Sequence, residues 1–238
     1  MTEFWESAFQ ENKRMWGEQP TDNAWTVLRL FKRHHLKSIL IPGFGYGRNA
    51  KVFYDAGMDV TGIELSGTAI ERARKQFNSN VKIYHASVTD MPFDNTWYES
   101  IYCYSLIHLL NKTDRIQLIT NCYSLLKYNG LMVYVALSIN DKRFGVGERI
   151  EKNTFRSPHG LILYFYDEAS IKEEFGSCHI IALKEIDEPE INPDERHWMV
   201  VCLKKAPAHK SHKTISLQKP ASNDQILQED PPKIIGQK

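Results

Sequence analysis

The feature that most constrains this chain is a short apolar segment followed by three glycines at alternating positions. Residues 39–41 (Ile-Leu-Ile) form a continuous apolar run, which is typical of a strand buried on both faces of a parallel sheet. Gly43, Gly45 and Gly47 allow a sharp turn and place no Cβ between the backbone and a ligand. The helix predicted next would point its free N–H groups at this turn. The segment therefore predicts a strand, a turn and a helix that bind a nucleotide-like cofactor with an anionic end.

The spacing of the glycines separates the cofactor classes. A dinucleotide-binding turn follows the pattern G-x-G-x-x-G, whose third glycine permits close packing of helix on strand. Arg48 occupies that third position here. This disfavours a nicotinamide-dependent oxidoreductase, although a structural turn with no ligand is also compatible with the motif taken alone.

A second predicted strand, residues 58–63, leads directly into an acid, Glu64. Glu64 lies 17 residues after Gly47, about one helix and one strand later. A carboxylate at the carboxyl end of this strand can accept hydrogen bonds from both hydroxyls of a ribose. The alternative is a solvated acid beside the helix that starts near Ser66. We expect the ribose role because the glycine turn lies at the right distance.

Composition narrows the class of protein further. The 238 residues include 30 basic and 29 acidic residues, so the net charge of +1 gives no electrostatic case for nucleic acid or a membrane surface. The four cysteines are scattered without a C-x-x-C pair, which predicts free thiols in a reducing compartment. The N-terminus lacks the core of a signal peptide, and the longest apolar run, residues 131–137, is too short to cross a bilayer. We therefore expect a soluble, cytoplasmic protein.

The chain divides into three predicted segments. Residues 1–37 have helical periodicity and form a helical lead-in or lid, whose second helix is predicted to be capped by Asp22. Residues 38–205 alternate strands and helices, which predicts βαβ units and a parallel α/β sheet that ends in an antiparallel pair of strands. Residues 206–238 are rich in Pro, Lys, Gln, Ser and Asp without a hydrophobic period, and predict a disordered tail.

The predicted strand ends bring the candidate binding residues together. In an open α/β sheet, ligands lie beyond the carboxyl ends of the strands. Besides the glycine turn and Glu64, the residues at such ends are Ser87, Val88, Cys103 and Tyr104. The polar, basic segment 138–160 follows another strand, and a loop of that length within a domain is usually functional or disordered. Trp16 lies in a loop with Gly17 and Pro20, where a packed core residue is less expected, and is a further candidate ligand contact.

At this point the motifs resemble those of a known family. Residues 38–137 look like a class I S-adenosylmethionine (SAM)-dependent methyltransferase, because the glycine spacing is similar to the first motif of that family. Residues 45–49 and 56–66 are similar to the tellurite-resistance methyltransferase TehB. Pro42 resembles the thiopurine and thiol methyltransferase branch, and Trp16 and His197 resemble features of both branches. By contrast, residues 90–94 and 98–101 resemble quinone C-methyltransferases.

This resemblance implies a Rossmann-like, doubly wound, mostly parallel seven-stranded sheet whose last strand is antiparallel. It implies SAM as cofactor and no metal. The cofactor-binding residues it implies are Trp16, Gly43, Gly45, Gly47, Arg48, Asn49, Glu64, Leu65, Ser87, Val88, Cys103 and Tyr104. Two positions depart from the family pattern, because Ile41 and Ser87 stand where acids are common.

The resemblance also implies a small-molecule methyl acceptor, with a thiol or another soft nucleophile preferred. A soft nucleophile that ionises near neutral pH needs little help from a base, whereas a hydroxyl or carbon acid needs one. His197 is the candidate base, and His108 is predicted to be a structural, hydrogen-bonded histidine. Arg143, together with other basic residues of segment 138–160, would attract an anionic acceptor unless the segment is merely solvated. A quinone-type C- or O-methyltransferase and a non-catalytic SAM-binding module stay open as alternatives.

Overall fold

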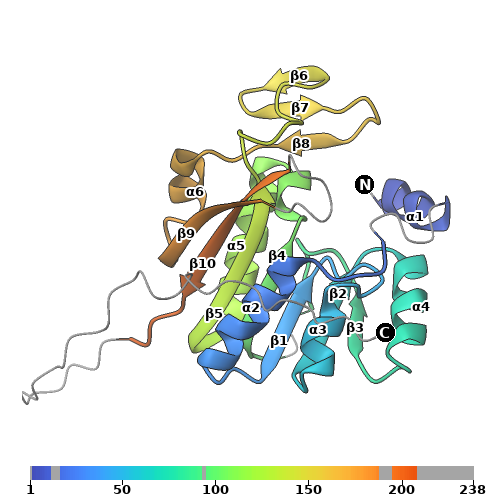
Figure 1. Cartoon of the computed structure of the whole chain (residues 1–238), viewed down its shortest axis with the longest axis vertical. Helices are drawn as coiled ribbons and strands as arrows, with labels where there is room; N and C mark the ends of the chain where they lie inside the picture. Colours follow the sequence, from blue (N-terminus) through green and yellow to red (C-terminus); the bar gives the residue numbers. More distant parts are fainter. Residues whose placement is uncertain (1, 12–16, 93–94, 188–194, 208–238) are drawn as a thin grey trace, which may run out of the picture. The chain divides into compact units, whose positions relative to one another are not determined.

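A computed structural model describes residues 2–11, 17–92, 95–187 and 195–207 (Figure 1). The chain up to Ala206 forms one compact unit, and the residues from Pro207 onward are assigned to a second unit. The structure below is that of the first unit. The helices within the described residues are all too short or too polar to span a bilayer.

The centre of the unit is a seven-stranded sheet with the order β3-β2-β1-β4-β5-β10-β9. Every strand is parallel to its neighbours except β10, which runs antiparallel to both β5 and β9. This confirms the predicted mostly parallel, seven-stranded sheet with an antiparallel last strand. The strands are β1 (Ser38–Pro42), β2 (Asp59–Glu64), β3 (Lys82–His85), β4 (Tyr98–Tyr104), β5 (Leu126–Leu137), β9 (His179–Asp187) and β10 (Arg196–Leu203).

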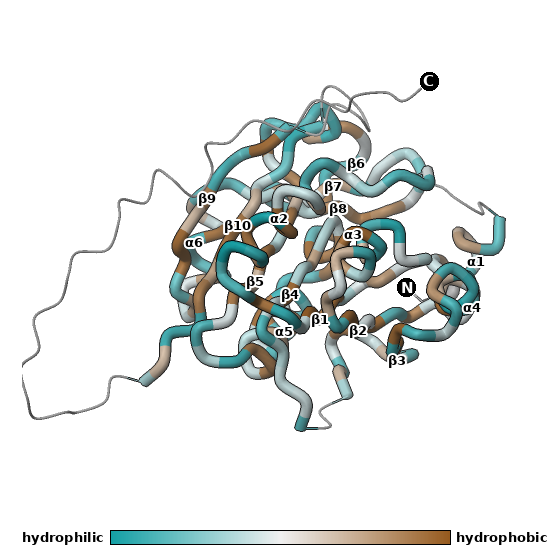
Figure 2. The backbone as a smooth tube through the Cα atoms, turned by 60° about the horizontal axis from the view of Figure 1, so that its bottom comes forward, coloured by the Kyte–Doolittle hydropathy of each residue, from teal (hydrophilic) through white to brown (hydrophobic). Residues whose placement is uncertain are grey.

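Helices cover both faces of this sheet, as a doubly wound fold requires. On one face, Phe53 of α3 packs against Phe31 of α2 and Tyr102 of β4, with ring centroids 6.0 and 5.3 Å apart. The other face carries a large apolar cluster shared with α5 and α6. Figure 2 shows the hydrophobic residues concentrated along the central strands. The helices are α1 (Thr2–Glu11), α2 (Asp22–Arg33), α3 (Ala50–Asp55), α4 (Gly67–Gln76), the 3-10 helix η1 (Ile107–Leu109), α5 (Lys112–Leu125) and α6 (Glu168–Glu174).

The cap of α2 differs from the prediction by one residue. Thr21, not Asp22, has the extended backbone of an N-cap, and its hydroxyl accepts a hydrogen bond from the Ala24 N–H at 3.3 Å. Asp22 is the first helical residue, where a negative charge still favours the helix dipole. Because α2 buries its apolar side chains, it belongs to the core of the unit.

The predicted loop 138–160 contains regular structure, which corrects the prediction for this segment. β6 (Glu148–Glu151) and β7 (Thr154–Arg156) form a hairpin, and β8 (Ile162–Tyr164) extends it to a three-stranded antiparallel sheet. Phe155 and Leu163 face each other across β7 and β8 and pack together with Leu137. Figure 1 shows this small sheet beyond the carboxyl ends of the central strands. Sequence pattern did not reveal it because every residue of β6 is exposed and polarity does not alternate there.

The predicted turn at Asn129 and Gly130 lies within β5 instead of preceding it. Asn129 takes a left-handed backbone with φ of 63°, and its N–H donates to the Lys204 carbonyl at 2.7 Å. Lys204 in turn donates its N–H to the Gly130 carbonyl. These two hydrogen bonds to the residue that follows β10 hold the distorted backbone in place, so β5 continues through Asn129 and Gly130. The four cysteines are buried free thiols, as predicted.

Candidate functional site

The glycine turn lies at the carboxyl end of β1 and is tied to the end of β2. Gly43, Gly45 and Gly47 all have positive φ angles, of 68°, 56° and 88°, which L side chains rarely adopt. The Gly43 N–H donates to the Ile63 carbonyl at 2.9 Å, and the Gly45 N–H donates to Oε2 of Glu64 at 2.7 Å. The turn and the acid that the sequence placed 17 residues further on are therefore in direct contact.

Glu64 is 6% exposed and organises the backbone around it. Its Oε1 accepts hydrogen bonds from the N–H groups of Leu65 and Ser66 at 2.8 and 2.9 Å. Burial raises the pKa of Glu64, and the hydrogen bonds from three backbone N–H groups oppose that shift. A carboxylate oxygen can accept two hydrogen bonds, and Oε2 receives only the one from Gly45 within the described residues. This oxygen is therefore able to accept a further hydroxyl.

The three glycines are required for different reasons. A Cβ at Gly47 would lie 2.4 Å from the Phe77 ring, so this position is closed by packing. A Cβ at Gly43 would lie 3.0 Å from Leu106. At Gly45 the nearest group is the Phe9 ring at 3.8 Å, so the backbone here borders a space that a side chain would fill. This is the property that the close approach of a cofactor requires.

Helix α1 covers this turn. Phe9 packs edge-on against Tyr46, with ring centroids 6.3 Å apart, and both side chains are buried. Glu6 accepts hydrogen bonds from the Ser66 hydroxyl at 2.7 Å and from the hydroxyl and N–H of Thr68 at the start of α4. These hydrogen bonds lower the pKa of Glu6 to about 2. Trp16, the predicted cofactor contact in this region, lies outside the described residues.

The remaining predicted cofactor residues are placed as follows. The Asn49 side chain accepts a hydrogen bond from the Thr21 N–H at 3.0 Å and so links the turn to α2. Arg48 and Leu65 are half-buried next to the turn and Glu64. After β3, the Ser87 hydroxyl accepts a hydrogen bond from the Thr89 N–H at 3.2 Å within a local turn.

Two predicted residues can approach a ligand in only a limited way. Val88 is buried against the apolar cluster beneath the sheet. Cys103 points its side chain into the same cluster, where burial raises the pKa of its thiol well above the usual range. Only the backbone of Cys103 is available near the site. The next residue, Tyr104, is half-buried at the end of β4.

A second group of aromatic side chains lies at the same edge of the sheet. His197 is 2% exposed, begins the pairing of β10 with β5 opposite Leu137, and stacks near Tyr104 at 6.4 Å between ring centroids. The His108 ring lies 6.5 Å from His197, and its Nδ1 accepts a hydrogen bond from the Leu137 N–H at 3.3 Å. His108 is thus a structural histidine, as predicted. Nδ1 of His197 is buried and has no partner among the described residues.

Residues 39–130 match the family model described as "Methyltransferase domain". This part of the chain is similar to methyltransferase domains. The matched residues run from β1 into β5 and include the glycine turn, Glu64 and Tyr104.

The chain is also similar to curated proteins. One is a glycine/sarcosine N-methyltransferase of Parasynechococcus marenigrum, with 25% identity over 124 residues that cover 50% of this chain and 44% of that protein. A second curated relative is covered over 52% of its length, so the chain spans about half the length of the curated relatives it matches.

Solved structures show the same fold. A Burkholderia thailandensis 1,6-didemethyltoxoflavin N1-methyltransferase, solved with S-adenosylhomocysteine, superimposes with a TM-score of 0.68 at 13% identity, covering 86% of this chain and 87% of that chain. TehB from Haemophilus influenzae has a TM-score of 0.57 at 16% identity, covering 75% of this chain and 61% of that chain. The thiol branch of the resemblance is not singled out by these comparisons.

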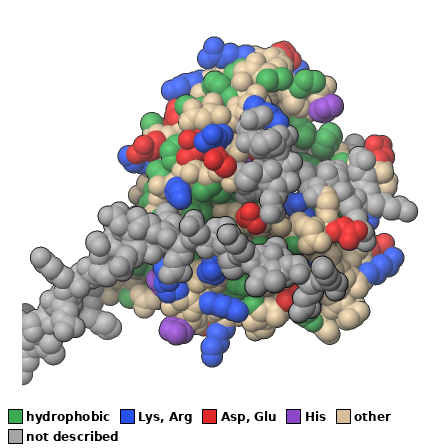
Figure 3. Space-filling model, viewed as in Figure 1, with side chains coloured by type: hydrophobic (Ala, Val, Ile, Leu, Met, Phe, Trp, Pro, Cys, Tyr) green, Lys and Arg blue, Asp and Glu red, His purple; other side chains and the backbone are tan. Residues whose placement is uncertain are grey.

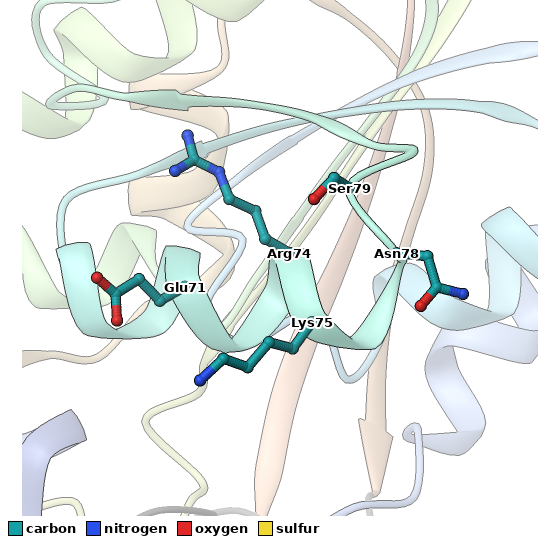
Figure 4. A pocket seen from close by; sticks show the side chains of 5 residues that line it. All are labelled: Glu71, Arg74, Lys75, Asn78 and Ser79. Carbon is teal, nitrogen blue, oxygen red and sulfur yellow. The ribbon is translucent and has the colours of Figure 1, made fainter.

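The pocket in Figure 4 is not part of this site. It lies on the outer side of α4 and the turn that follows, away from the carboxyl ends of the strands. It is lined by Glu71, Arg74, Lys75, Asn78 and Ser79. None of these residues was predicted to bind a ligand.

Burial of His197 gives the stability of the protein a testable pH dependence. Burial, followed by the charge of Arg143, lowers the pKa of His197 from 6.5 to about 4. Between pH 6.5 and pH 4 the His197 imidazole is protonated in the unfolded chain but stays neutral in the folded protein. The contribution of this residue to stability is therefore fully present above pH 6.5 and is lost as the pH falls toward 4. The expected loss through this residue is about 3 kcal/mol.

Urea unfolding of the parent and of His197→Gln between pH 7 and pH 4.5 measures this effect. As the pH falls, the free energy of unfolding of the parent should decrease more steeply than that of the variant. The difference in slope should correspond to about one extra proton bound per chain on unfolding. Because every other titrating group is shared, an identical pH slope in the two proteins would show that His197 is not held neutral by the fold.

Two residues of the site, Glu6 and Asp141, were not found from the sequence. Glu6 lies in a helix whose apolar spacing suggests only packing. No motif in the sequence around Asp141 indicates a role for it. Asp141 becomes visible only in three dimensions, where it joins Arg143 to the first residue of β10. The only sequence signal in this region was the basic character of segment 138–160.

Proposed function

We propose that this protein is a SAM-dependent methyltransferase of a small molecule, with a thiol or another soft nucleophile as the leading acceptor. The observation that carries the proposal is the contact between the Gly45 N–H and Glu64. It couples an open glycine turn to a buried carboxylate that can take a ribose hydroxyl. The methyltransferase domain match and a structural relative solved with S-adenosylhomocysteine support the same cofactor.

In this proposal Glu64 binds the ribose and the glycine turn lies against the amino acid end of the cofactor. Leu65, Ser87 and Val88 border the adenine. The bound cofactor would supply an electrophilic methyl group. The protein's contribution is alignment of the acceptor, which is worth several kcal/mol and up to roughly 7–11 kcal/mol in favourable cases. Phe9 of helix α1 packs against Tyr46 of the glycine turn and so excludes water from the turn.

The preference for a soft nucleophile is supported by the state of His197. An imidazole whose pKa is about 4 is neutral at pH 7 and is a weak base. It suits an acceptor that ionises near neutral pH without much help, as a thiol does. Its role would be to accept a hydrogen bond or the departing proton. A nitrogen acceptor is the second candidate, because two relatives are N-methyltransferases by name.

Titration of the purified protein with S-adenosylhomocysteine and with NAD tests the cofactor. We expect saturable binding of S-adenosylhomocysteine and none of NAD, because Arg48 stands where a dinucleotide turn needs glycine. Tight NAD binding without a response to S-adenosylhomocysteine would overturn the proposal.

Transfer of a radiolabelled methyl group then tests the acceptor. The panel contains small thiols, selenite, tellurite, glycine, a demethylquinone and tRNA. Labelling of the thiols supports the leading acceptor, and labelling confined to glycine supports the second candidate. Labelling confined to the quinone or to tRNA would reject both. Binding of SAM with no acceptor methylated would favour a non-catalytic SAM-binding module.

A further inference from the structure

An ion pair between a buried acid and a partly exposed arginine lies at the acceptor side of the site, against the strand that carries His197. Asp141, 3% exposed, accepts hydrogen bonds from Nε and Nη2 of Arg143 at 2.7 and 2.9 Å, which is a bidentate pair. Asp141 also accepts from the Arg196 N–H at 2.8 Å, and Arg196 directly precedes His197. The guanidinium is therefore fixed relative to the strand that carries His197.

The positive end of this pair dominates the field at the two histidines. Arg143 lowers the pKa of both His197 and His108, and on each of them its effect exceeds the opposing effect of Asp141. Tyr104, at the end of β4, also lies within electrostatic range of the guanidinium. A field of this sign beside a candidate acceptor site favours a negatively charged group there.

Arg143 keeps hydrogen-bonding capacity for a ligand. Its Nη2 lies 3.4 Å from Glu195, while Nη1 has no hydrogen-bond partner among the described residues. Glu195 is a weak competitor, because the contact is long. The guanidinium is partly exposed, so it can be reached from solvent.

The other basic residues of this region do not share these properties. Arg149 is exposed on β6, and Arg156 forms an exposed pair with Glu148 at 2.6 Å. Figure 3 shows Lys and Arg side chains on the outer surface around the small sheet. These residues match the solvated alternative, whereas Arg143 is held in place by a buried acid.

We propose that Arg143, oriented by Asp141, binds a carboxylate of the methyl acceptor, so that the preferred substrates are small anionic thiols. This inference rests on the proposed function. In it, Arg143 contacts the substrate and determines specificity, and Asp141 is a positioning residue. The acceptor sulfur would then lie on the His197 side of the guanidinium, with the carboxylate anchored on Nη1.

Three thiols of similar size and different charge test the inference. They are 3-mercaptopropionate, 2-mercaptoethanol and cysteamine, which are anionic, neutral and cationic away from the sulfur. With radiolabelled SAM, we expect the KM for mercaptopropionate to be the lowest by about tenfold or more. Arg143→Met should raise that KM about 10- to 100-fold and change the KM for mercaptoethanol by a much smaller factor. Arg156→Met is the matched control and should change neither value.

Binding measurements separate the inference from the acceptor class. Calorimetric titration of the S-adenosylhomocysteine complex with 3-(methylthio)propionate and 2-(methylthio)ethanol needs no turnover. If no thiol is methylated but the carboxylate binds only when Arg143 is present, the anion site stands and the thiol proposal is wrong. If transfer proceeds equally from all three thiols, or Arg143→Met affects them equally, the inference is overturned while the methyltransferase proposal stands.

Asp141→Asn distinguishes positioning from direct contact. It keeps the shape of the side chain but weakens the bidentate pair, so we expect a smaller rise in the KM for mercaptopropionate than Arg143→Met gives. The Kd for S-adenosylhomocysteine should be unchanged in both variants. If the Kd for S-adenosylhomocysteine rises by the same factor as the KM for mercaptopropionate, the pair only stabilises the fold. That result would overturn the inference.

Discussion

Glu64→Ala is expected to weaken binding of S-adenosylhomocysteine by roughly 1–3 kcal/mol, or about 5- to 150-fold in Kd. The variant removes the proposed acceptor for the ribose hydroxyls. It also leaves the N–H groups of Gly45, Leu65 and Ser66 without their carboxylate partner. The turn then keeps its backbone hydrogen bond to the Ile63 carbonyl but loses the one to the Glu64 side chain, so the ligand has to supply more of its order. Isothermal titration calorimetry at a temperature where the variant is folded measures the change.

The matched control is Glu71→Ala. Glu71 is an exposed acid on α4, the helix that follows Glu64, and it lines only the outer pocket of Figure 4. This variant removes the same side chain from the same part of the chain and should bind S-adenosylhomocysteine like the parent. If Glu64→Ala also binds like the parent, the cofactor lies elsewhere in the protein.

The cofactor half of the site was predictable because its signals are local. A buried strand, a glycine turn and an acid one helix and one strand later each leave a pattern within a short stretch of sequence. Parallel pairing of β1 with β2 then brings the ends of both strands together, as the topology of βαβ units dictates. The structure adds the direct hydrogen bond from Gly45 to Glu64, which spacing alone does not specify.

The acceptor half was less predictable because it depends on contacts between distant segments. Arg196 reaches Asp141 from 55 residues away, and no periodicity marks that contact. The hairpin within segment 138–160 was missed because its first strand is exposed on both sides and has no alternating polarity. Glu6 was missed because its partners, Ser66 and Thr68, belong to a helix about 60 residues further along the chain.

Glu174→Ala is expected to destabilise the fold by about 3–5 kcal/mol, because it leaves a buried guanidinium without its counter-charge. The side chains of Arg115 in α5 and Glu174 in α6 are 3% and 2% exposed. Nε and Nη2 of Arg115 contact Glu174 at 2.7–3.0 Å, and the Tyr166 hydroxyl donates to the same carboxylate at 2.7 Å. The pair joins two helices to the segment after β8, so its loss affects contacts between distant parts of the chain.

Chemical and thermal denaturation of Glu174→Ala and Glu173→Ala measure the loss of stability for two neighbouring acids of one helix. Glu173 forms an exposed pair with Lys112, and its removal should change stability little because water solvates both charges. The Glu174 variant should melt roughly 6–20 °C below the parent. Replacing both partners, as Arg115→Met with Glu174→Leu, should recover part of the loss, since the penalty comes from the unpaired charge rather than from the missing attraction. Equal stability of the two single variants would show that the Arg115 guanidinium finds water or another partner when Glu174 is absent.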